Sequence, residues 1–208
     1  PFNNASATRD YLRGLKEKVA ARGLELIQGR LLTKNTVPFA EATADIRQQV
    51  DHARLLGMKT LLNTGTGKEA EYETWYRLMN YAAGYAADAG IALVTKPHGG
   101  VNAAAAEILT CVERINHRNL GIWYDAGNII FYTGKDPLAE LEPIIGHVTA
   151  FTAKDCTGER GDVMIQFGAG RVDFEGIFRR LARAGFNGPI MVECCKIGAT
   201  APETTANA

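Results

Sequence analysis

The strongest constraint on the fold is one pattern that recurs six times: an amphipathic helix, a glycine or asparagine, and a short apolar strand. Glycine ends a helix readily because it adopts the left-handed conformation without a Cβ clash. Alternating helices and apolar strands predict parallel strands joined by right-handed crossovers. The predicted helices are 9–22, 40–56, 69–89, 102–116, 137–145 and 173–184, and the strands are 24–27, 59–63, 91–95, 120–124, 147–151 and 189–193.

Two architectures fit this pattern: an open doubly wound sheet and a closed (β/α)8 barrel. The open sheet usually carries a glycine-rich phosphate loop, but Thr64-Gly-Thr-Gly-Lys68 lacks the spacing of a P-loop and reads as a turn. Polar residues gather where the apolar strands end, and in a barrel those ends converge on one mouth. The sequence therefore favours a TIM barrel with its chemistry at that mouth.

Six strands do not close an eight-stranded barrel. We therefore interpret residues 1–208 as a single partial barrel domain, with the first two strands and the last helix absent from the sequence. The chain starts at Pro1 rather than Met, and Thr200-Ala-Pro-Glu203 reads as the capped start of a helix just before the end.

The composition of the chain argues against some classes of binding partner. Lys+Arg and Asp+Glu both number 23, so the basic excess typical of nucleic-acid binders is missing. No apolar run approaches the roughly 18 residues that span a bilayer, which argues against a membrane partner. The four cysteines lack paired C-x-x-C spacing and read as reduced thiols, which favours a cytoplasmic location. The sequence is compatible with an N-terminal signal before Pro1 and with a homo-oligomer.

Five segments in order resemble the xylose isomerase-like barrels, a group that includes sugar isomerases, sugar epimerases, inosose dehydratases and the endonuclease IV branch. The resemblance runs from about Tyr11 to Glu193 and is densest after residue 90. The segments are Lys96-Pro-His-Gly-Gly100, Tyr124-Asp-Ala-Gly-Asn128, Phe151-Thr-Ala-Lys-Asp155, Gly168-Ala-Gly-Arg-Val-Asp-Phe174 and Gly188-Pro-Ile-Met-Val-Glu193.

The resemblance implies one divalent metal held by Glu, Asp, His and Glu from four successive strands. Those positions hold Lys96, Asp125, Thr152 and Glu193, so two of the four ligands are replaced. We expect the Lys96 ammonium to lie between Asp125 and Glu193 and to stand in for the charge of the metal. The alternative is one divalent ion (Mn, Mg, Co or Zn) on Asp125 and Glu193 with His98.

The predicted catalytic residues are Glu193, Lys96 and Asp125. Glu193 is the candidate base, and Lys96 the group that stabilises an enolate or enediolate oxygen or moves a proton. Residues 156–172 form a long glycine-rich connection that suits a lid over the mouth. The predicted substrate-binding residues are His98, Asn128, Lys154, Asp155, Arg30 and Gln166.

These residues predict a sugar isomerase or epimerase that removes a proton next to a carbonyl. Elimination from a keto-sugar starts with the same step. The alternative is a sugar-binding barrel without catalysis, in which the metal site has degenerated. A nucleic-acid repair enzyme is disfavoured by the zero net charge and by the four histidines, too few for a zinc cluster. The expected partner is a small, sugar-like molecule.

Overall fold

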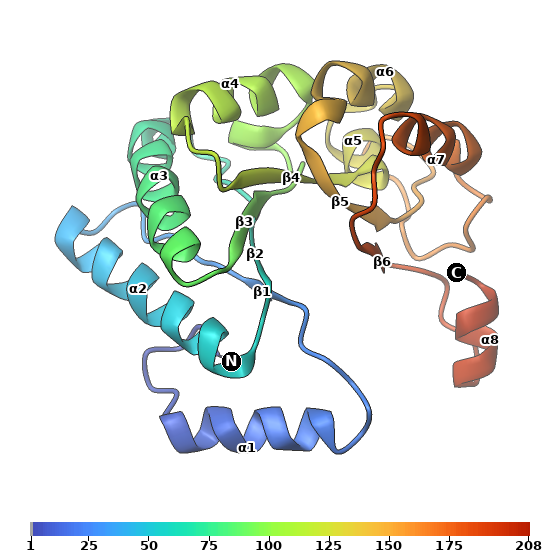
Figure 1. Ribbon diagram of the computed structural model, residues 1–208. Helices are drawn as coiled ribbons and strands as arrows, with labels where there is room; N and C mark the ends of the chain where they lie inside the picture. The colour runs from blue at the N-terminus through green and yellow to red at the C-terminus, as the bar shows by residue number, and fades with distance from the viewer. Residues whose placement is uncertain (1) are drawn as a thin grey trace. The chain divides into compact units, whose positions relative to one another are not determined.

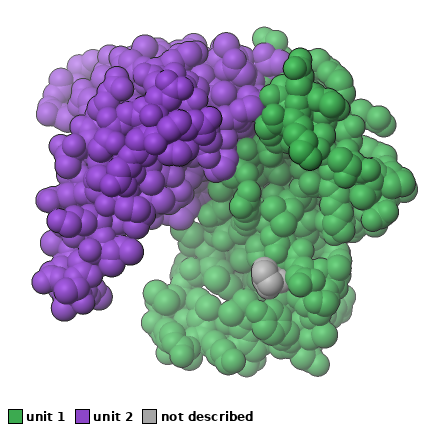
Figure 2. Space-filling view, turned by 180° about the vertical axis from the view of Figure 1, so that it is seen from behind, with its two compact units in different colours: residues 1–95, 111–121 green, residues 96–110, 122–208 purple. Residues whose placement is uncertain are grey.

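The computed structural model describes residues 2–208, which form two compact units (Figure 2). Unit 1 comprises the residues up to Thr95 and Cys111–Gly121, and unit 2 comprises Lys96–Thr110 and Ile122–Ala208. None of the helices over residues 2–208 has the length and hydropathy of a bilayer-spanning helix. All four cysteines are free thiols, and Cys111 and Cys156 are buried.

Unit 1 contains three helix-to-strand repeats (Figure 1). Strands β1, β2 and β3 pair in parallel in chain order, with Leu61 opposite Gly29 on one side and Leu93 on the other. The elements are α1 (Arg9–Ala20), β1 (Gln28–Arg30), α2 (Phe39–Leu56), β2 (Thr60–Asn63), the 3-10 turn η1 (Glu69–Glu71), α3 (Tyr72–Asp88) and β3 (Ala92–Thr95).

The helices of unit 1 bury one face each, as their apolar spacing requires. Along α2, Ile46, Val50 and Ala53 recur at helical spacing and are fully buried. On α3, Trp75 is fully buried, and its indole Nε1 donates to Asn63 Oδ1 at 2.9 Å. The apolar stripe of each helix therefore faces the core. The indole N–H of Trp75, which is buried with it, has a hydrogen-bond partner.

The second half of the chain continues the alternation. Strands β4, β5 and β6 pair in parallel in chain order, with Asp125 opposite Thr152 and Thr152 opposite Met191. The elements are η2 (Gly100–Asn102), α4 (Ala105–Ile115), β4 (Leu120–Asp125), α5 (Ala126–Thr133), α6 (Pro137–Leu141), η3 (Glu142–His147), β5 (Val148–Ala153), α7 (Phe174–Arg183), β6 (Ile190–Val192) and α8 (Ala201–Ala206).

Two elements differ from the sequence prediction. The first strand lies at Gln28–Arg30 and not at residues 24–27, where Leu24 and Ile27 remain 61% and 46% exposed. Pairing with β2 sets this register, and a short apolar run does not reveal it. The segment after Asp125, where the sequence predicts no helix, forms α5, because the Asp125 carboxylate caps this helix by accepting from Asn128 N–H. The capped helix start at Thr200 is confirmed.

Candidate functional site

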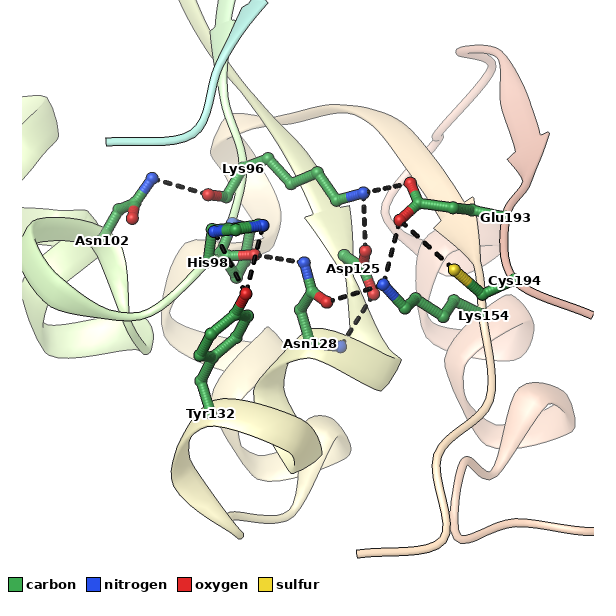
Figure 3. A network of polar contacts seen from close by, with 10 residues as sticks. Lys96, His98, Asn102, Asp125, Asn128, Tyr132, Lys154, Glu193 and Cys194 are labelled. Atoms are coloured by element: carbon green, nitrogen blue, oxygen red, sulfur yellow. Dashed lines mark hydrogen bonds and ion pairs between the residues drawn. The ribbon is translucent and has the colours of Figure 1, made fainter. Parts of the chain in front are cut away.

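Unit 2 gathers two lysines and two carboxylates at the ends of successive strands (Figure 3). Lys96 follows β3 directly, Asp125 ends β4, Lys154 follows β5 and Glu193 follows β6. Parallel strands present their carboxyl ends on the same side, so residues distant in sequence converge there. The structure therefore brings together the three predicted catalytic residues and Lys154.

The Lys96 ammonium lies between the two carboxylates. Its Nζ is 2.7 Å from Asp125 Oδ2 and 2.5 Å from Glu193 Oε2. The side chains of Lys96 and Asp125 are 4% and 0% exposed, whereas Glu193 is 36% exposed. This is the placement expected from the sequence: one fixed positive charge bridges the two acidic positions.

Lys154 forms the second cationic arm of the cluster. Its Nζ donates to Glu193 Oε1 at 2.9 Å and to Asn128 Oδ1 at 3.0 Å. Asn128 also donates from Nδ2 to Pro97 O at 2.7 Å, so its amide orientation is set from both ends. An ammonium has three N–H donors. Lys154 uses two of them here, whereas Lys96 donates one to Glu193 and meets Asp125 as an ion pair, so each ammonium retains a donor for a ligand.

The electrostatics of the cluster oppose the role predicted for Glu193. Burial raises the pKa of Glu193, but Lys96 and Lys154 outweigh it and hold that pKa at about 2. For Asp125 burial prevails over the same two lysines, and its pKa is raised. Burial lowers the pKa of Lys154, yet Asp125 and Glu193 raise it overall. Glu193 is therefore a weak base, and Lys154 stays charged at neutral pH.

His98 lies beside Tyr132, a residue that the sequence reading did not select. Tyr132 Oη is 3.1 Å from His98 Nε2 and 3.2 Å from Nδ1. Gly99 allows this packing, because its φ is +77° and a Cβ there would lie 2.8 Å from the Tyr132 ring. Tyr132 lies on α5, a helix that the sequence pattern does not predict, so its place beside His98 is not predicted either.

Asp155 is fully buried and holds the long loop in place. Its two carboxylate oxygens accept from the backbone N–H groups of Cys156, Gly168, Gly170 and Val172 at 2.8–3.2 Å. These bonds occupy both oxygens. We therefore propose a structural role for Asp155, in place of the sugar contact expected from the sequence.

The contacts of two predicted binding residues, Arg30 and Gln166, do not include the lysine–carboxylate cluster. Arg30 belongs to unit 1, where its Nη2 donates to Thr64 Oγ1 at 3.0 Å. Gln166 lies exposed in the long loop, and its backbone carbonyl accepts from Ala169 N–H. Contact of either side chain with a ligand stays a prediction.

A family model described as the xylose isomerase-like TIM barrel matches residues 3–208. The chain belongs to this family. A xylose isomerase domain protein from Planctomyces limnophilus is similar in structure, with 21% identity, 96% of this chain and 79% of that chain covered, and a TM-score of 0.78. The 3-keto-D-glucoside 4-epimerase of E. coli is 12% identical, with 95% and 84% covered and a TM-score of 0.72. No curated protein sequence matches significantly.

Membership of the xylose isomerase-like family confirms the predicted fold class, a partial (β/α)8 barrel. A family-type barrel from Mycobacterium smegmatis, solved in complex with magnesium, is 13% identical to this chain, with 98% of this chain and 77% of that chain covered and a TM-score of 0.79. These likenesses establish architecture, since neighbours at such low identity differ widely in function.

The residues present do not fit a divalent ion at the corresponding place. Lys96 puts an ammonium within 2.7 Å of both remaining carboxylates, and Thr152 stands where the resemblance implies a histidine. Within residues 2–208, no group of three or more His, Cys, Asp or Glu side chains is arranged to hold a metal. His98 contacts Tyr132, and the predicted set of Asp125, Glu193 and His98 gains no support from the described residues.

Proposed function

We propose that unit 2 binds a keto-sugar or related polyol without a metal and catalyses isomerisation or epimerisation through an enediolate. The position of the Lys96 ammonium, 2.7 Å from Asp125 and 2.5 Å from Glu193, carries the proposal. A sugar isomerase must stabilise the oxygen that becomes negative when the neighbouring C–H loses its proton. A fixed, buried ammonium supplies that stabilisation, as a preorganised donor does in an oxyanion hole.

In this scheme the remaining N–H donors of Lys96 and Lys154 bind the substrate carbonyl oxygen. Glu193 takes the proton from the adjacent carbon, and the C–H electron pair forms the enediolate. For isomerisation the same carboxyl group returns the proton to the neighbouring carbon on the same face, while the hydroxyl proton moves between the two oxygens. Epimerisation requires a proton donor other than Glu193 on the opposite face. No redox partner is needed. Because the lysines keep Glu193 weakly basic in the free protein, the reaction requires them to turn part of their hydrogen bonding toward the substrate.

The pKa of Glu193, about 2, favours a second candidate: a sugar-binding barrel without turnover. A carboxylate this acidic is far from the neutral pKa that suits a general base. The same two ammonium groups still offer N–H donors to sugar oxygens, so loss of catalysis leaves binding intact.

Hydrogen exchange in D2O separates the two candidates. The protein is incubated with D-fructose or D-tagatose, and 1H NMR follows loss of the C–H signal next to the carbonyl and the appearance of isomers. An enzyme exchanges the proton, and Lys154→Met lowers kcat/KM by about 10²-fold. Lys135→Met is the matched control, because Lys135 is 48% exposed and pairs with Glu140 outside the cluster. Saturable binding with no exchange supports the binding protein, and no binding of either sugar refutes both.

A further inference from the structure

The inner face of β4 and β5 carries three buried polar atoms that lack a hydrogen-bond partner. They are Trp123 Nε1, Asp125 Oδ2 and Thr152 Oγ1. Their residues are 1%, 0% and 0% exposed. Asp125 Oδ2 meets the Lys96 ammonium as an ion pair but accepts no hydrogen bond of normal geometry. Native proteins rarely leave buried polar atoms unpaired, so a cluster of three needs an explanation.

Strand geometry places these three side chains together. Trp123 and Asp125 are two residues apart on β4 and therefore share a face. Asp125 is the register partner of Thr152 on the neighbouring strand. Tyr124 and Phe151 face the other way: the Tyr124 hydroxyl donates to Pro137 O at α6, and the Phe151 ring packs on Phe178 of α7. The unpaired atoms thus lie on the face opposite to the covering helices.

Several buried polar side chains elsewhere in the described chain have partners, although Asn35 Oδ1 in unit 1 is also buried without one. The indole of Trp75, the other tryptophan, donates to Asn63 Oδ1 at 2.9 Å. The Tyr124 hydroxyl and both ends of the Asn128 amide are also bonded. What distinguishes β4 and β5 is that three such atoms share one face of two paired strands, and this face adjoins the lysine–carboxylate cluster through Asp125.

The donor and acceptor pattern indicates what the face accepts. Trp123 offers an N–H, Thr152 a hydroxyl that donates or accepts, and Asp125 an acceptor oxygen. A hydroxyl group both donates and accepts, and it complements this set. An anion does not, because the Asp125 carboxylate repels it.

We propose that Thr152 and Trp123 bind hydroxyl groups of an uncharged polyol part of the ligand, next to the oxygen held by the two lysines. This inference rests on the proposed sugar-binding function. It makes Thr152, at the position of a replaced metal ligand, a residue that determines specificity.

The test uses protein labelled with 15N in its tryptophan indoles, titrated with D-fructose and D-tagatose. We expect the Trp123 indole signal to shift with saturation and the Trp75 signal to stay fixed, with Trp123→Phe giving the assignment. Thr152→Val weakens binding about tenfold, the effect of one hydrogen bond, while Thr152→Ser retains it. Because Val removes an unpaired buried hydroxyl, Tm rises by about 2–4 °C in the absence of sugar.

Each contrary outcome has a distinct meaning. In the first, saturation-transfer NMR detects sugar binding that is lost in Lys154→Met, but the Trp123 signal stays fixed and Thr152→Val keeps wild-type affinity. This result overturns the inference and leaves the proposed function standing. Failure of both sugars to bind overturns the two together. A fall in Tm for Thr152→Val shows that its hydroxyl is already paired and also overturns the inference.

Discussion

Removing the Lys96 ammonium tests whether this charge organises the site. In Lys96→Met a side chain of similar length stays, but Asp125, which is fully buried, loses the cation 2.7 Å away. At an effective dielectric constant near 20, two unit charges at that distance attract by about 6 kcal/mol. Desolvation offsets part of this, and breaking a buried pair by removing one partner typically costs about 3–5 kcal/mol. We expect a loss in that range at pH 7.

Urea unfolding followed by circular dichroism measures the loss. Lys135→Met is the control, since its partly exposed pair with Glu140 is worth about 1 kcal/mol or less. The double variant Lys96→Met/Asp125→Asn recovers stability, because the unpaired buried charge is gone. If the single variant unfolds, this double variant serves as the folded reference. A loss in Lys96→Met no larger than in Lys135→Met refutes the idea that Lys96 neutralises a buried carboxylate.

Three further predictions address acid stability, metal binding and the loop. Because the folded-state pKa of Glu193 is lowered from 4.5 to about 2, its contribution to the free energy of unfolding is present above pH 4.5 and is lost as the pH falls toward 2. Glu193→Gln therefore reduces the fall in stability between pH 4.5 and 2, and an unchanged fall contradicts the lowered pKa of Glu193. Lys96→Glu/Thr152→His acquires a near-stoichiometric divalent metal by elemental mass spectrometry, whereas a folded, metal-free variant shows that the site cannot be rebuilt by these two changes. In Gly170→Ala the new Cβ clashes with Asp155 Oδ1 and speeds proteolysis of the loop, while Gly158→Ala, with open space around it, does not. Equal proteolysis rates refute the idea that Asp155 holds the loop in place.

The alternation of helices and strands was readable from the sequence, since periodicity and glycine positions are local. Most predicted helices lie within a few residues of the observed ones, and the Thr200 cap is confirmed. The strand predicted at residues 24–27 is wrong because pairing, a long-range property, sets the edge register. Helix α5 was missed for a related reason: Asp-Ala-Gly-Asn suits both a turn and a capped helix start, and tertiary packing decides between them.

The sequence by itself determined which residues stand at the strand ends, and so it predicted that Lys96, Asp125 and Glu193 meet. Only the tertiary structure decided what each of them does there. The acidity of Glu193 depends on a second ammonium, Lys154, from another strand, and the unpaired state of Thr152 and Trp123 depends on every neighbour in space. Strand position is a local, periodic property of the chain, whereas pKa values and hydrogen-bond satisfaction are sums over contacts between residues distant in sequence.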